Sequence, residues 1–207
     1  MGGHWARLTG VAFVVLALVS FLVGGEPPDA DAPGAEVIGF YDENSGQQQF
    51  SAGLGLWAAV FLVFFAGAVR SALRSAEPGR GGLSVVAFGG GVVAAVGIGM
   101  FSTLAFALAE EADSIDPAAA QALHVLSMYA FAPLAIGVGT FLIAAGLASV
   151  RTGGLDAWLG WLAIVIGILA VTPLGFVGFL AFLAWTLVAS IMLAMRAEAA
   201  ATTPPPD

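Results

Sequence analysis

The side chains in this chain that are best suited to bind a metal lie close together in the sequence. Glu111, Asp113 and Asp116 precede an expected helix, and His124 lies eight residues after Asp116. Carboxylate oxygens and imidazole nitrogens are common ligands of divalent metals. One imidazole with carboxylates at irregular spacings is an incomplete ligand set, so a histidine hydrogen-bonded to its local surroundings is the competing interpretation. We therefore expect no metal site and no bound cofactor, and these four residues remain the candidate ligands.

Two stretches resemble parts of membrane-enzyme active sites but lack the partners that catalysis needs. Glu110-Glu111 is similar to the glutamate pair of membrane prenyl-protein proteases, which also use a nearby arginine and further histidines. The stretch Gly82–Val85 is the nearest match to the serine motif of rhomboid-type proteases, but no histidine is available to face it. The chain also has no cysteine, which excludes disulfides and thiolate metal sites. We expect a protein that is not an enzyme.

The elements that must position these side chains are apolar helices. Hydrophobic residues make up 59% of the 207 residues and charged residues only 10%, and the mean hydropathy is +0.97. A soluble domain carries about 25% charged residues. The composition therefore predicts an all-α, polytopic transmembrane helix bundle, in a single domain over residues 1–198, followed by a disordered tail over 199–207. Six spans are expected, at approximately residues 7–24, 49–69, 83–109, 117–150, 157–172 and 176–195.

The positive charges predict how this bundle is oriented. The chain has no lysine, and all its arginines fall on one side of the alternating map of spans: Arg7, Arg70, Arg74, Arg80, Arg151 and Arg196. Because arginine-rich flanks stay in the cytoplasm, both termini are expected inside. The high alanine, glycine and arginine content favours a bacterial plasma membrane. The first span also fits a cleavable signal peptide, whose removal would leave five spans.

The acidic residues gather in the two larger outer connections, and the net charge is −8. This acidic face makes nucleic-acid binding implausible. In the first of these connections, residues 25–48, Asp31-Ala32-Pro33 favours the start of a short amphipathic helix. Its apolar arc consists of Val37, Ile38, Phe40 and Tyr41. So short a helix is unstable alone, and we expect it to form an extracytoplasmic cap that packs on residues 104–109 and 120–128.

The helices expected over 83–109 and 117–150 are longer than a bilayer needs, so both should project outward beyond it. Asp116 and Pro117 are typical of a helix N-cap and first helical residue, and Pro133 predicts a kink. Tyr129 is expected in the outer aromatic belt, and Trp158 and Trp161 at the cytoplasmic interface.

Small residues repeat at every fourth position along the span 83–109. The predicted ridge consists of Ala87, Gly91, Ala95, Gly99 and Thr103. Small residues allow helices to approach closely in a membrane, so this ridge predicts a packing seam inside the bundle. A seam between two copies of the chain remains an alternative.

Two stretches carry a family resemblance. They are residues 31–41 (Asp-Ala-Pro-Gly-Ala-Glu-Val-Ile-Gly-Phe-Tyr) and 151–162 (Arg-Thr-Gly-Gly-Leu-Asp-Ala-Trp-Leu-Gly-Trp-Leu). Together they resemble an actinobacterial-type family of six-span integral membrane proteins classed as a domain of unknown function. The resemblance implies a membrane bundle of about this length and supplies no functional residues. Where that family often has Pro-Arg before the tryptophan, this chain has Asp156-Ala157.

The spans lack an ionisable residue at mid-depth, which argues against proton-coupled transport. The sequence therefore favours an accessory or scaffold protein that acts through helix and outer-face contacts. A passive channel or facilitator for a small neutral or apolar solute is the alternative, and a lipid-modifying enzyme is the third. The expected partners are the lipid bilayer and either a second copy of the chain or another membrane protein.

Overall fold

The computed structural model describes residues 5–77 and 82–202, and every regular element in these ranges is an α-helix. The helices are α1 (Trp5–Gly24), α2 (Gly34–Glu43), α3 (Ser45–Ala76), α4 (Gly82–Glu110), α5 (Pro117–Tyr129), α6 (Phe131–Thr152), α7 (Ala157–Ala170) and α8 (Gly175–Thr202). The predicted all-α class is thus confirmed for the described part of the chain.

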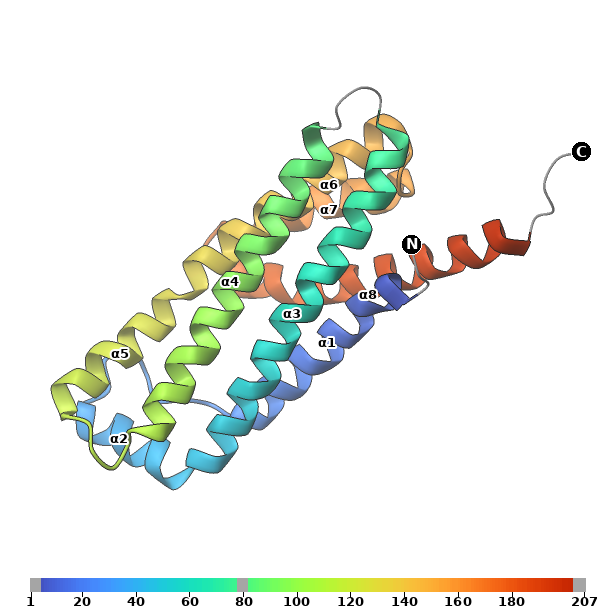
Figure 1. The fold of residues 1–207 in the computed structure, drawn as a ribbon. Coiled ribbons are helices and arrows are strands. Elements are labelled where there is room, and N and C mark those ends of the chain that lie inside the picture. Colours follow the sequence, from blue (N-terminus) through green and yellow to red (C-terminus); the bar gives the residue numbers. More distant parts are fainter. Residues whose placement is uncertain (1–4, 78–81, 203–207) are drawn as a thin grey trace, which may run out of the picture.

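Four long helices form the body of the molecule. α1, α3, α4 and α6 lie side by side in that order, and α7 packs on the outer side of α6 (Figure 1). α8 crosses behind the bundle at a steep angle and packs mainly on α1 and α7. α2 and α5 gather at one end of the bundle, where α2 contacts α5 and α4.

Four apolar segments are long enough to cross a membrane. They are α3, α4, the continuous segment Pro117–Thr152 that contains α5 and α6, and Gly175–Arg196 of α8. α7 is apolar but has only 14 residues, about 21 Å of helix against about 30 Å of hydrocarbon. Large side chains such as Leu22, Phe50 and Trp57 are exposed on the surface. Because soluble proteins rarely expose so much apolar surface, these helices indicate a membrane protein.

The prediction of a single helix over residues 117–150 is wrong, because the structure divides this segment into α5 and α6. The break falls at Ala130, whose N–H donates to the carbonyls of Leu126 and Ser127 at 3.0 and 3.1 Å. Pro133 has no N–H to donate to the Tyr129 carbonyl, and its ring crowds that carbonyl. The proline predicted to kink the helix therefore interrupts it.

The predicted boundary between the last helix and the C-terminal tail is also wrong. Residues 199–202, expected in a disordered tail, continue α8 to Thr202. The rest of that tail, 203–207, lies outside the described residues.

Aromatic rings fill the centre of the bundle. Phe141 of α6 lies 6.2 Å from Phe65 of α3 and 6.1 Å from Phe182 of α8, measured between ring centroids. Trp185 lies 5.9 Å from Phe141, and its indole N–H donates to the backbone carbonyl of Leu159 on α7 at 3.0 Å. All four rings are fully or almost fully buried. The edge-on arrangement of these rings and the indole hydrogen bond therefore join α3, α6, α7 and α8.

Candidate functional site

The first candidate region is the head, which we define as residues 25–44 with α5 and the end of α4. α2 forms over the segment whose apolar arc predicted it, and it presents Val37 and Tyr41 as buried side chains. Ile38 and Phe40 are half-buried. The surface beneath α2 is formed by Ala105, Leu108, Ala109, Ala112, Ala120 and Leu123. The head thus has a small apolar core of its own, separate from that of the bundle.

His124 lies at the centre of the head and is fully buried. Its Nε2 lies 3.0 Å from the carbonyl oxygen of Pro28, so this nitrogen carries the proton and donates. Its ring centroid is 6.3 Å from that of Tyr41, in an edge-on arrangement. The other ring nitrogen, Nδ1, is buried without a hydrogen-bond partner among the described residues. Burial also raises the pKa of Tyr41 to about 12.

The structure separates His124 from its candidate co-ligands. Glu111, Asp113 and Asp116 are all exposed. Asp116 caps α5 as predicted, since its Oδ1 accepts from the backbone N–H of Ala118 at 2.9 Å. Glu111 accepts from the hydroxyl of a neighbouring serine at 2.9 Å. The described residues contain no group of three or more side chains that could hold a metal ion, so the proposed grouping of these four residues is wrong.

Three glutamines at the start of α3 tie this helix to the ends of α1 and α4, and the sequence analysis missed them. Gln47 and Gln48 donate to the carbonyls of Val23 and Gly24, the latter at 2.6 Å. Gln49 donates to a carboxylate oxygen of Glu110 on α4 at 2.8 Å. The signal in the sequence was the run of three amides directly after an acidic loop. The amides of Gln47 and Gln48 satisfy carbonyls at the end of α1 that have no partner within their own helix.

The predicted small-residue ridge on α4 is only partly a seam. Ala87, Gly91 and Ala95 are buried, but Gly99 is half-exposed and Thr103 is exposed. A Cβ added to Gly99 would have open space around it, so Gly99 is not a packing residue. Steps of four residues advance about 40° around a helix at 3.6 residues per turn. From Ala87 to Thr103 the predicted ridge therefore rotates by about 160°, away from any single neighbour.

Gly91 of the predicted ridge lies close to Ala66 of α3, but the close approaches to α6 are made by other glycines, many of them seven residues apart. Gly90 and Gly97 of α4 face the backbone of α6, and Gly137 of α6 faces the backbone of α4. On another side of α6, Gly139 and Gly146 lie against the glycines of α7. A Cβ on Gly139 would lie 3.0 Å from the carbonyl oxygen of Gly167. α6 is therefore held by glycine seams on two of its sides.

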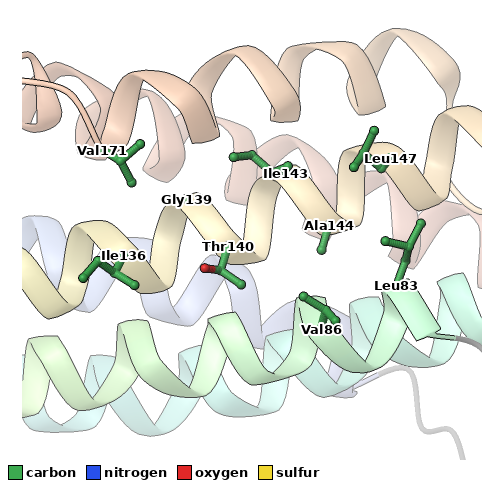
Figure 2. Close-up of a pocket in the computed structure, with 9 residues that line it drawn as sticks. All are labelled: Leu83, Val86, Ile136, Gly139, Thr140, Ile143, Ala144, Leu147 and Val171. Carbon is green, nitrogen blue, oxygen red and sulfur yellow. The ribbon is translucent and has the colours of Figure 1, made fainter.

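Between these two seams lies an apolar groove of about 380 Å³. Figure 2 shows α6 as its floor, with Leu83 and Val86 of α4 on one side and Val171 beyond the end of α7 on the other. Thr140 is the one lining residue with a side-chain hydroxyl. The lining from α6 consists of Ile136, Gly139, Thr140, Ile143, Ala144 and Leu147. The groove can hold an apolar chain and offers little for catalysis.

Arginines occupy the end of the bundle opposite the head. Arg70 stacks over the ring of Phe88 at 5.8 Å, and Arg74 donates to the backbone carbonyl of Glu77 at 3.2 Å. Arg196 pairs with Asp156 at 2.6 Å. Asp156, at the N-cap position of α7, makes no capping hydrogen bond there.

The three expected interface anchors are all exposed. Tyr129 lies at the break between α5 and α6, and Trp158 and Trp161 lie in the first turns of α7. Amphipathic rings at such positions suit the boundary between hydrocarbon and water, so their assignment as anchors stays a prediction.

Comparisons with protein-family models, with curated proteins and with solved structures gave no match for this chain. The resemblance to the actinobacterial-type family therefore stays a prediction.

Proposed function

We propose that this chain is a six-span protein of a bacterial plasma membrane, with the arginine end in the cytoplasm and the head outside. The four long apolar segments supply four spans, and α1 and α7 supply the two shorter ones. The segregation of arginines from the acidic head supports this orientation. α7 is short enough that the bilayer must thin locally around it or its exposed tryptophans must adjust to the interface.

We further propose that the protein is a non-enzymatic accessory or scaffold subunit that acts through contacts. The observation that carries this proposal is the ordered head. A connection between two spans needs only a few residues, but residues 25–44 build a helix, a separate core and a buried histidine contact. Such a structure presents a fixed acidic surface, which is the property that recognition of a partner requires.

The filled core argues against the alternative of a central solute pathway. Phe65, Phe141, Phe182 and Trp185 occupy the space between α3, α6 and α8. A solute moving along the bundle axis would have to displace these packed rings, which interiors resist at a cost of several kcal/mol.

Cysteine labelling tests the topology, because the chain has no native cysteine. Ser114 and Ser75 form a matched pair, since both are exposed serines and they lie at opposite ends of the bundle. Ser114→Cys should react with a membrane-impermeant thiol reagent on intact spheroplasts, whereas Ser75→Cys should react only after lysis. Labelling of Ser75→Cys without lysis contradicts the orientation.

The accessory role is tested by the mass of the complex purified from native membranes in mild detergent. We expect the parent chain to purify in a complex larger than one copy. Glu36 and Asp42 are exposed on the head, so reversing both charges to lysine should weaken the complex without unfolding α2. Ser71→Lys with Ser75→Lys, at exposed positions of the other end, is the control and should leave the complex intact. If the parent chain and every variant purify as a single copy without a partner, the proposal is contradicted.

A further inference from the structure

Among the residues that the structure describes, one arginine at the cytoplasmic end has no partner. Arg70, Arg74 and Arg196 each contact a ring, a carbonyl or a carboxylate. Arg151, in the last turn of α6, is exposed and has no hydrogen bond or ion pair with any residue that the structure describes. Its guanidinium, always charged, is therefore available to an anion from outside the chain.

Helix geometry places Arg151 in line with the apolar groove. At about 100° per residue, the groove-lining residues of α6 other than Gly139 fall within an arc of about 100°, and Arg151 falls inside the same arc. Arg151 follows Leu147 by one helical turn. Figure 2 shows Leu147 and Leu83 at the same end of the groove. Residues four apart on a helix are neighbours, with Cβ atoms about 5–6 Å apart. A ligand that fills the groove can therefore reach Arg151 at one end.

The size of the groove favours a single chain over a helix. From Ile136 to Leu147 the groove follows α6 for about 16 Å. A helix segment of that length and about 10 Å across occupies about 1,300 Å³, more than three times the groove volume of about 380 Å³. A second helix could thus lie over the groove only with most of its volume outside it, whereas a single chain can lie within it.

We propose that this groove binds one acyl chain of an anionic phospholipid whose phosphate pairs with Arg151. The inference rests on the membrane location proposed above, and it adds a specific lipid site that runs along α6 and has its charged end at the cytoplasmic end of the bundle. Acyl carbons match the apolar lining, and the phosphate supplies the partner that Arg151 lacks. Basic positions between helices on the cytoplasmic side are suited to anionic headgroups.

The test is native mass spectrometry of the intact chain, purified in mild detergent and titrated with two lipids. Dioleoyl phosphatidylglycerol and dioleoyl phosphatidylcholine have the same acyl chains and differ in net charge. The parent chain should retain one phosphatidylglycerol more tightly than phosphatidylcholine. Arg151→Gln should weaken phosphatidylglycerol binding by about tenfold or more, since a hydrogen bond to a charged group is lost. Arg74→Gln, an arginine at the same end but outside the groove, should change neither affinity.

Two variants test the acyl part of the site. Thr140→Trp places a large ring on the floor of the groove and Val86→Trp places one on its α4 side, and both positions are exposed, so the fold should tolerate them. Each should weaken the binding of both lipids. Unchanged phosphatidylglycerol binding in Arg151→Gln and in both tryptophan variants overturns the proposal. A dimer that Thr140→Trp dissociates, without retained lipid, overturns it in favour of a second copy of the chain. A chain that needs no detergent to stay in solution contradicts the membrane role itself, whereas a detergent-soluble chain without bound lipid contradicts only the lipid site.

Discussion

Replacing Gly97 by alanine should separate the two central helices, α4 and α6. A Cβ built on Gly97 would lie 2.5 Å from the backbone nitrogen, 2.7 Å from the Cα and 2.9 Å from the Cβ of Leu134. Cβ atoms essentially never approach heavy atoms more closely than 3.0 Å, so the helices must move apart by at least 0.5 Å at this point (3.0 minus 2.5 Å). The colliding atoms belong mainly to the backbone, so no change of rotamer relieves the contact.

Gly99, two residues further along the same helix, is the matched control. A Cβ there would have no neighbour within 4 Å. Alanine stabilises a helix relative to glycine by up to about 1 kcal/mol, and this term is shared by both variants. Overpacking a closely packed contact costs about 1–3 kcal/mol. Gly97→Ala should therefore be less stable than Gly99→Ala by about 1–3 kcal/mol.

The assay is unfolding of both variants in mixed detergent micelles with increasing denaturing detergent, followed by far-ultraviolet circular dichroism. Gly99→Ala should unfold at the same or a slightly higher detergent fraction than the parent chain, and Gly97→Ala at a lower one. Equal stability of the two variants would show that the α4–α6 seam is looser than described. A larger loss of stability in Gly99→Ala than in Gly97→Ala would show that the predicted four-residue ridge is the packing seam.

Two further predictions concern the head. Val37→Asp places a carboxylate in the core beneath α2 and should destabilise the head by a few kcal/mol, whereas Ala35→Asp, on the exposed side of the same helix, should not. Thermal melting in detergent measures the difference, and equal melting temperatures would show that α2 is not docked. In a Tyr129→Phe variant Tyr41 is the sole tyrosine, and absorbance at the phenolate band should show ionisation at about pH 12 in the folded chain and about pH 10 in the unfolded chain. Because the folded pKa is the higher one, docking is unaffected below pH 10 and loses about 3 kcal/mol of stability as the pH rises from 10 to 12. Ionisation near pH 10 in the folded chain would mean that Tyr41 is exposed to water.

The parts of the fold that the sequence predicted depend on local patterns. Apolar runs bounded by charge or proline gave the positions of the long helices, and the arc around Val37 and Tyr41 gave α2. Asp116 before Pro117 gave the start of α5 to the residue. Each of these signals lies within one turn or one helix, so it can be recognised without knowledge of the tertiary structure.

The contacts of His124 could not be predicted from such local signals. Its hydrogen-bond partner, Pro28, lies 96 residues away in the chain. Proximity in the sequence suggested Asp113 and Asp116 instead, but the first turns of a helix point their capping carboxylates back at its own N–H groups. Asp116 was therefore already engaged by α5 and unavailable to the histidine about two turns later.

The helix seams were missed for a geometric reason, which also explains the groove. A repeat of four residues drifts by about 40° per step, whereas a repeat of seven drifts by only about 20° in the other direction, so glycines seven apart stay on one face for longer. On α6 this gives one seam at Gly137 towards α4, and another at Gly139 and Gly146, nearly half a turn round the helix, towards α7. Two seams so far apart leave the arc between them without a covering helix. α7 ends at Ala170 and is too short to cover this arc. The exposed surface of α6 that includes Thr140 therefore extends as far as Arg151. The open groove is thus a consequence of the glycine spacing, and Arg151, which has no partner among the described residues, lies on the same arc of α6. An amphipathic ligand is the kind of molecule that suits both.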